Sequence, residues 1–103
     1  MSDKSELIFD ANLAAPLFKE LSERGGELGL IWGESGGALS LAELEVAALE
    51  RVGALPDGFE DGIDANLEIE SDVLKYILLG ISEGATRLKV GVDGERILFT
   101  VAR

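Results

Sequence analysis

The segment TRLKVGVDGERILFTV, residues 86–101, predicts a β-hairpin. Asp93-Gly94 is a favoured two-residue turn, and it joins two segments in which apolar and polar residues alternate. The turn predicts the pairs Val92 with Glu95, Val90 with Ile97, Leu88 with Phe99 and Thr86 with Val101. The apolar face then consists of Leu88, Val90, Ile97, Phe99 and Val101, and the other face of Arg87, Lys89 and Arg96. Because the apolar face must be covered, the hairpin predicts a sheet packed against other elements.

Three further segments predict extended structure. ELGLIWGESGGALS, residues 27–40, is typical of a second hairpin with its turn at ESGG. SELIFD, residues 5–10, predicts an edge strand, and NLEIE, residues 66–70, predicts a short strand. Trp32 is the only tryptophan, and we expect it to anchor the core rather than to bind a partner.

Two helices are predicted from their apolar stripes and their end signals. The first covers residues 13–24, with Asn12 as its N-cap and a glycine pair after its last turn. The second follows Ser71 and ends before Gly84. Gly80 lies inside this helix, where Gly costs about 1 kcal/mol relative to Ala. We therefore expect either close packing or a frayed end at this position.

A third helix is predicted over residues 41–52. Ser40 and Glu43 match the S-x-x-E capping box, and apolar residues follow at helical spacing. With this helix, the chain is expected to form a small single α+β domain. Its antiparallel sheet would contain the two hairpins and the short strands, packed with about three helices.

The order of these elements suggests an internal duplication. DANL occurs at residues 10–13 and again at 64–67, and each copy precedes a helix and a hairpin. The chain of 103 residues is thus interpreted as one domain with half-repeats 5–41 and 59–102, joined by the helix over 41–52.

The composition excludes several kinds of chemistry. The chain contains no Cys and no His, so it has no disulfide, no thiol nucleophile, no Ser-His-Asp triad and no zinc site of the usual kinds. We expect a protein that is not an enzyme and needs no cofactor or metal. No apolar stretch approaches the roughly 20 residues of a membrane span, and no secretory signal is recognised at the N-terminus, so a cytoplasmic setting is expected.

Negative charge is concentrated in the middle of the chain. The formal net charge is −11, and residues 34–72 hold eleven acids and one base. PDGFEDGIDANLEIESD, residues 56–72, contains seven carboxylates and no base. We predict that these residues bind a partner: Asp57, Glu60, Asp61, Asp64, Glu68, Glu70 and Asp72. The alternative is a solvated connector, because Asp-Gly dipeptides are typical of turns and acidic surfaces keep small proteins in solution.

Part of this segment also resembles a calcium loop. Asp57, Asp61, Gly62 and Glu68 match positions 1, 5, 6 and 12 of an EF-hand loop, and the predicted helix over 41–52 precedes them. Phe59 stands where a third ligand is needed, and Ala65 where a fourth ligand usually acts. Calcium binding is therefore kept as a lesser alternative.

The leading functional hypothesis is a non-catalytic protein that docks on a basic partner macromolecule. It would inhibit or escort that partner, as immunity proteins, antitoxins, anti-defence proteins and secretion chaperones do. If the partner normally binds nucleic acid, the carboxylates would imitate phosphates. Direct binding of nucleic acid is not expected, because the basic strip of Arg87, Lys89 and Arg96 is small beside the net charge. The same three bases could be a solvated face or partners for the acidic segment.

Two other hypotheses remain open. The C-terminal hairpin could leave an open edge strand, which would make the chain a subunit of a homodimer or larger homo-oligomer. A small carboxylate enzyme is the second alternative, because Glu68 and Glu70 would share one face of a strand.

Overall fold

The computed structural model describes residues 5–94 and 96–103, in which ten elements follow one another. They are β1 (Glu6–Asp10), α1 (Ala11–Arg24), β2 (Leu28–Gly33), β3 (Gly36–Leu41), β4 (Leu44–Ala47), β5 (Glu50–Val52), β6 (Ile63–Leu67), α2 (Ser71–Ser82), β7 (Arg87–Asp93) and β8 (Arg96–Ala102). Sheet A has the strand order β5-β1-β7-β8, and sheet B has the order β4-β3-β2-β6. The α+β class is confirmed. The described chain has two antiparallel sheets and two helices, where one sheet and about three helices were expected.

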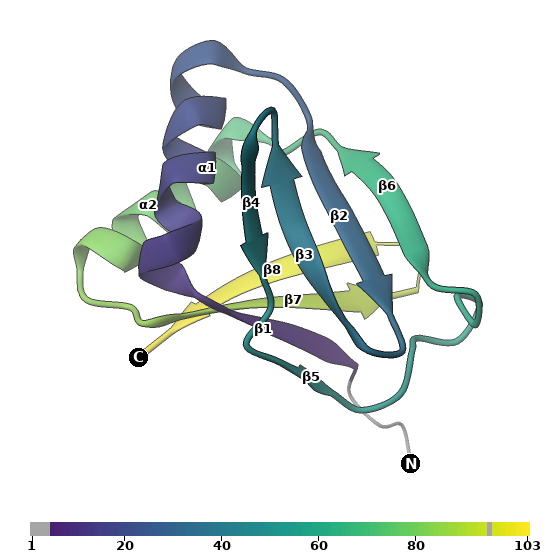
Figure 1. Cartoon of the computed structure of the whole chain (residues 1–103). Helices are drawn as coiled ribbons and strands as arrows, with labels where there is room; N and C mark the ends of the chain where they lie inside the picture. The colour runs from purple at the N-terminus through teal and green to yellow at the C-terminus, as the bar shows by residue number, and fades with distance from the viewer. Residues whose placement is uncertain (1–4, 95) are drawn as a thin grey trace.

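The two sheets enclose the core, and both helices lie at one end of them, with sheet B in front of sheet A in Figure 1. The inward faces of the sheets supply Leu7, Phe9, Leu88 and Val90 from sheet A and Leu28, Leu30, Trp32 and Leu39 from sheet B. Helix α1 adds Ala14, Leu17, Phe18 and Leu21. The ring of Phe18 meets the ring of Phe99 edge-on, with centroids 6.0 Å apart. Neither helix of the described chain is long and apolar enough to cross a bilayer.

The segment from β4 to β5 carries the chain from sheet B to sheet A. The Ala48 amide donates to the Gly37 carbonyl at 2.8 Å, which continues the pairing with β3. The next amide, of Leu49, donates to the Ile8 carbonyl of β1 at 2.6 Å. The sheets are therefore joined along this side, while β6 and β8 are outer strands of their sheets.

The helix predicted over residues 41–52 is wrong, because this segment forms β4 and β5. Leu44 and Val46 alternate with exposed Glu45, which fits a strand as well as the apolar spacing fits a helix. Ser40 belongs to β3 and forms no capping box. The turn before β4 contains Ala42 at φ 53°, a left-handed conformation that Ala seldom adopts, so the sequence has no ordinary turn signal here.

The C-terminal hairpin is confirmed, but its register differs from the prediction. Asp93 opposes Arg96, so the turn begins one residue later than expected. Val90 therefore opposes Phe99, and Leu88 opposes Val101. Glu95, the predicted partner of Val92, lies outside the described residues, and Val92 instead opposes Ile97. Each partner has moved by two positions, and side chains alternate with a period of two, so the predicted faces are retained.

Strand β1 is not the edge strand that its sequence predicts. It pairs with β5 on one side and with β7 on the other, and both partners are distant in sequence. Its last residue, Asp10, is also the N-cap of α1, where Asn12 was expected. The Asp10 carboxylate accepts from the amides of Asn12 at 2.9 Å and Leu13 at 3.3 Å. Helix α1 therefore begins two residues earlier than predicted.

The order strand, helix, hairpin does occur twice, as β1-α1-β2-β3 and as β6-α2-β7-β8. The two halves exchange strands, because β1 pairs with β7 and β6 pairs with β2. The linker between them is β4 and β5 rather than the predicted helix. The repeated DANL is not at equivalent places: residues 64–67 lie within β6, whereas residues 10–13 span the start of α1. A duplicated origin thus stays a prediction, carried by element order alone.

Gly80 packs closely against β8, as expected for a glycine inside a helix, and the alternative of a frayed helix end is not needed. A Cβ added to Gly80 would collide with Cγ2 of Val101 on β8. One turn earlier, the Tyr76 hydroxyl accepts from the Val101 amide at 3.3 Å. Helix α2 therefore covers the outer edge of β8 near its end. It begins at Ser71 itself, with Glu70 rather than Ser71 at the N-cap position and no side-chain cap.

We expect Gly80→Ala to lower the free energy of unfolding by up to about 2 kcal/mol. The clash with Val101 should cost about 1–3 kcal/mol, which outweighs the gain of about 1 kcal/mol from the higher helix propensity of Ala. Urea denaturation would measure the difference. In a Val101→Ala background, the same substitution should become neutral or stabilising. An equal loss in both backgrounds would show that the clash is not the cause.

Candidate functional site

The seven predicted carboxylates lie in one continuous segment that runs from the β5–β6 loop through β6 to the start of α2, and we call them the acidic band. Asp57, Glu60 and Asp61 lie in the loop between β5 and β6. Asp64 lies on β6, Glu68 and Glu70 follow this strand, and Asp72 lies in the first turn of α2. Figure 1 shows this segment passing from the loop, along β6, to the far end of the strand.

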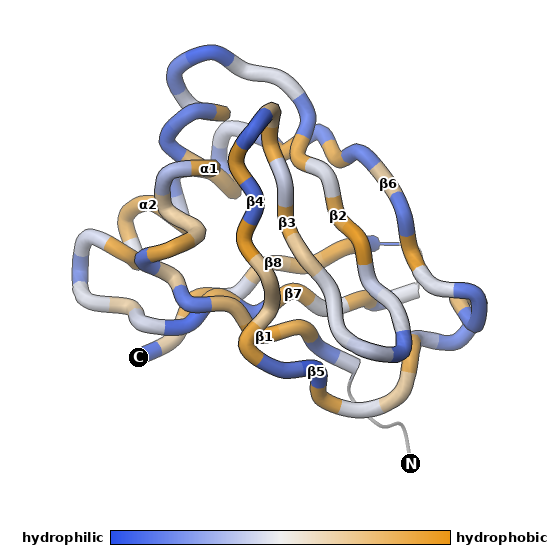
Figure 2. Tube along the Cα trace, viewed as in Figure 1, coloured by the Kyte–Doolittle hydropathy of each residue, from blue (hydrophilic) through white to orange (hydrophobic). Residues whose placement is uncertain are grey.

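The middle of the acidic band has a regular geometry. From Ile63 to Glu70, residues at odd positions are wholly or partly buried and those at even positions are exposed. Asp64 therefore points to the outer side of sheet B, and Glu68 and Glu70 continue the same alternation of exposure in the segment that follows β6. Figure 2 shows the corresponding alternation of hydrophilic and hydrophobic residues along β6. The strand predicted over residues 66–70 is confirmed only at residues 66–67, because β6 begins and ends three residues earlier.

The carboxylates of the acidic band are exposed and form no ion pair with a base in the described part of the chain. In residues 5–94 and 96–103, one salt bridge is found, and it joins Glu20 to Arg24 within α1. Inside the band, the Glu60 carboxylate accepts from the Gly58 amide at 3.3 Å. Arg51, the one base of residues 34–72, points inward and donates to the Gly33 carbonyl at 3.5 Å. The negative charge of the band is thus neutralised by no basic side chain of the described chain.

The basic strip of the C-terminal hairpin does not face the acidic band. Arg87 lies directly opposite Asp10 of β1, and Arg96 opposes Asp93 across the hairpin. Lys89 opposes Ile8. These bases lie on the outward face of sheet A, whereas the band borders sheet B. This arrangement agrees with the interpretation of the basic strip as a solvated face. It does not agree with ion pairing between the strip and the acidic segment.

The structure adds an apolar side chain that the prediction omitted. Ile31 on β2 is 52% exposed and lies directly opposite Asp64 of β6. On the same outward face its other cross-strand neighbours are small, since Ala38 pairs with Ile31 and Ala47 pairs with Ala38. The alternation of buried Leu30 and Trp32 around it was the signal in the sequence that Ile31 faces outward. The face therefore has an exposed apolar centre and an acidic border.

The EF-hand alternative lacks its flanking helices. The residues before the loop form strand β5, and those after it form strand β6. In the part of the chain that the structure describes, no group of three acidic side chains is arranged to hold a metal ion. Glu68 and Glu70 do share one side of the extended segment, as the enzyme alternative required. The cavity between α1 and β4 lies at the other edge of sheet B, away from both carboxylates.

Comparison with known proteins adds no relative: no family model, no curated protein and no solved structure matches this chain.

Proposed function

We propose that the chain is a non-catalytic protein that docks on a basic surface of a partner macromolecule through the acidic band. The observation that supports this proposal is that all seven carboxylates are exposed, lie in one continuous segment and pair with no base of the described chain. Like charges held this close repel one another, and a basic partner would relieve the repulsion. Inhibition or escort of that partner, in the cytoplasm, remains the proposed role.

The outward face of sheet B supports a protein partner. Protein interfaces combine an apolar centre with a polar rim, and the exposed Ile31 beside the acidic border provides both. Asn66 opposes Gly29, and Ser40 opposes Gly29 from the other side, so this part of the face is nearly flat. A partner that normally binds nucleic acid would meet carboxylates where it usually meets phosphates, which keeps nucleic-acid mimicry within the proposal.

Neutralising the acidic band should abolish partner capture. The test variant carries Asn or Gln at Asp57, Glu60, Asp61, Asp64, Glu68 and Glu70. The control variant carries Asn or Gln at six exposed acids elsewhere: Glu23, Glu27, Glu34, Glu50, Glu83 and Asp93. Both have the formal charge −5 instead of −11, since each removes six acids. In a pull-down from lysate of the source organism or its host, the native chain and the control should retain a basic partner and the test variant should lose it.

Equal capture by all three proteins would contradict the proposal and make the acidic band a solvated connector. Equal loss in both variants would show that net charge, and not the position of the band, controls binding. For a retained partner, raising the salt concentration from 50 mM to 500 mM should weaken binding at least tenfold, because charge-led docking is screened. Circular dichroism of each variant confirms that it is folded.

Self-association through β8 is the second candidate. Strand β8 is the outer strand of sheet A, and Leu98 is exposed on it. The Val101 amide already donates to the Tyr76 hydroxyl, so another strand could pair with this edge only near Ile97 and Phe99. A monomer mass at tens of micromolar in sedimentation equilibrium would eliminate this candidate.

A further inference from the structure

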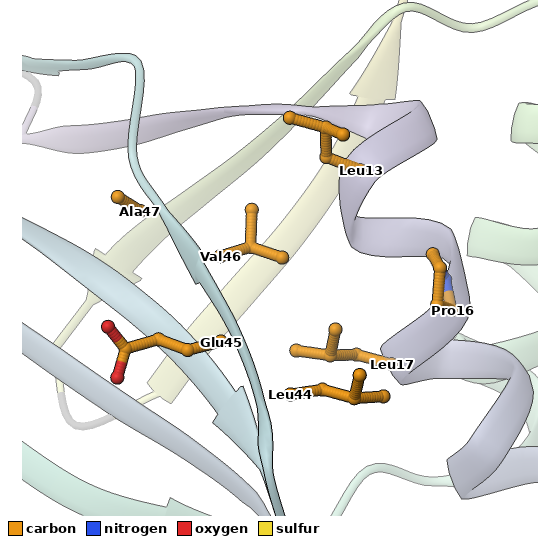
Figure 3. Close-up of a pocket in the computed structure, with 7 residues that line it drawn as sticks. All are labelled: Leu13, Pro16, Leu17, Leu44, Glu45, Val46 and Ala47. Carbon is orange, nitrogen blue, oxygen red and sulfur yellow. The ribbon is translucent and has the colours of Figure 1, made fainter.

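A second surface lies at the other edge of sheet B, between α1 and β4. A cavity of about 360 Å³ opens here, a volume within the range of ligand sites. Figure 3 shows side chains of both elements converging on it. Its lining residues are Leu13, Pro16 and Leu17 from α1 and Leu44, Glu45, Val46 and Ala47 from β4. Leu13 is 61% exposed, and Leu44 is also exposed, so the groove is apolar and accessible.

Strand β4 has an unpaired backbone edge along this groove. Like β6 at the opposite edge, it is an outer strand of sheet B, and it pairs with β3 on one side. The Ala48 amide donates toward β3 and the Leu49 amide toward β1, so the amides alternate between the two sides. By the same alternation, the N–H and C=O groups of Glu45 and Ala47 point away from β3. These groups have no backbone partner in the described chain.

The edge is open because β1 ends too early to cover it. Strand β1 pairs with the edge of β5 that corresponds to the unpaired edge of β4, and Ile8 lies opposite Glu50. The chain leaves the sheet after Asp10 and begins α1 at Ala11. Helix α1 then passes over β4 without pairing to it and supplies the far wall of the groove. One strand position beside residues 44–47 is therefore unpaired, with an apolar cavity next to it.

The charges around the groove indicate what it would accept. Glu43, Glu45 and Glu50 are exposed along the β4–β5 segment, and none of them forms an ion pair with another residue that the structure describes. Figure 3 shows the Glu45 carboxylate directed away from Leu13 and Leu17. A bound strand would thus meet apolar side chains on the inner side, where Leu44 and Val46 lie, and carboxylates on the outer side. A segment that alternates apolar and basic residues is complementary to both.

We propose that the groove binds an extended segment of a partner protein, which pairs with β4 as an additional strand of sheet B. One apolar side chain of the segment enters the cavity, and a Lys or Arg lies beside Glu43 or Glu45. This goes beyond docking on the acidic band, which lies at the opposite edge of the sheet. A second copy of the chain is a poorer occupant than such a segment, because each copy carries a formal charge of −11.

The probe is a fluorescein-labelled, terminally blocked nonapeptide in which Lys and Val alternate. Its control has the same sequence with N-methyl groups on alternate residues, which leaves the charge unchanged and removes the amides needed for pairing. Binding is measured by fluorescence anisotropy in 300 mM salt, where exposed charges are strongly screened. The native chain should bind the probe at least tenfold more tightly than the control. In hydrogen exchange, the Glu45 and Ala47 amides should slow when the probe is bound.

Two variants test the groove in the whole chain. Ala47→Pro removes an amide that points away from β3, so the existing ladder is retained while the probe loses its donor. Leu13→Ser removes an apolar wall, and its matched control is Leu79→Ser, because Leu79 on α2 is equally exposed at 60%. Ala47→Pro and Leu13→Ser should each weaken probe binding at least tenfold. The control Leu79→Ser should leave probe binding unchanged.

The other outcomes overturn the proposal. Equal affinity for the probe and its N-methylated control would mean that charge alone attracts the peptide. Equal weakening by Leu13→Ser and Leu79→Ser would place binding elsewhere. A dimer in sedimentation equilibrium that Ala47→Pro dissociates would make a second copy the occupant. The variant with Asn or Gln in the acidic band should still bind the probe. The experiment therefore distinguishes a wrong assignment of the acidic band from a wrong assignment of the groove.

Discussion

Trp32→Ala is expected to lower the free energy of unfolding by about 3–5 kcal/mol, as large-to-small substitutions of buried aromatic residues do. Trp32 is 1% exposed and is the largest side chain of the core. It lies on the inward face of β2, opposite Gly37 of β3 and Ile63 of β6. Since domains of this size are stable by only about 5–15 kcal/mol, this loss would remove a large share of the stability.

The matched control is Ile31→Ala, one residue away on the same strand. Ile31 points outward and is half exposed, so its removal should change stability by less than about 1 kcal/mol. Urea denaturation followed by circular dichroism is the appropriate measurement, because Trp32 is the only tryptophan and its fluorescence is lost in the variant. Similar losses in both variants would contradict the assignment of opposite faces. If the proposed docking surface is correct, Ile31→Ala should instead weaken partner capture.

Trp32→Phe provides a finer test of the same site. The indole Nε1 of Trp32 is buried and has no hydrogen-bond partner in the described chain. An unsatisfied buried donor costs about 1–3 kcal/mol, and Phe does not carry it. We expect this variant to lose much less stability than Trp32→Ala, because the relief offsets part of the lost volume. The role of Trp32 as a core anchor was predictable, since Leu28 and Leu30 precede it with strand alternation.

The residues that share a face were predicted better than the residues that pair. In the C-terminal hairpin, Val90 and Phe99 were assigned to the apolar face but not to each other. Alternation depends only on the period of a strand, whereas pairing depends on which residue begins the turn. The same limit explains β1, whose apolar pattern predicts a strand but does not reveal that β5 and β7 cover both of its edges.

The segment 41–52 shows where local signals fail. Its apolar residues fit both a helix and a strand, and the Ser40–Glu43 capping box favoured the helix. The decisive contacts are non-local, because β4 pairs with β3 and the following residues reach Ile8 of β1. The Ala42 turn, at φ 53°, has none of the Gly, Asn or Asp residues that normally mark a hairpin.

This misassignment also determined which candidate sites could be found. The acidic band is continuous in sequence, so its seven carboxylates could be identified without a structure. The groove beside β4 could not, because it requires a strand at 44–47, a helix that begins immediately after Asp10, and their meeting in space. Leu13 lies in the segment predicted as the first helix, residues 13–24, and Leu44 lies in the segment predicted as the third helix, residues 41–52. In the structure they are exposed and line one cavity.

Gly37→Ala is the second substitution with a large expected effect, a loss of about 1–3 kcal/mol or more. Gly37 lies on β3 and faces sheet A across the core. An added Cβ would collide with the carbonyl oxygen of Ile31 and would lie 2.6 Å from Cδ1 of Leu7, which belongs to the other sheet. Leu7 could change its rotamer, but the Ile31 carbonyl is part of the β2 backbone and cannot move without disturbing β2.

Gly33→Ala is the control for this prediction, because an added Cβ at Gly33 meets no atom within 4 Å. Neither glycine has a positive φ, so Ala can adopt both backbone conformations and the comparison isolates the collision. Gly33→Ala should be neutral or slightly stabilising, since it restricts the unfolded chain. Equal stability of the two variants in urea denaturation would mean that the sheets can separate at Gly37. In that case β3 and β4 could also shift relative to α1, and the groove would not have the fixed shape on which binding of an extended segment depends.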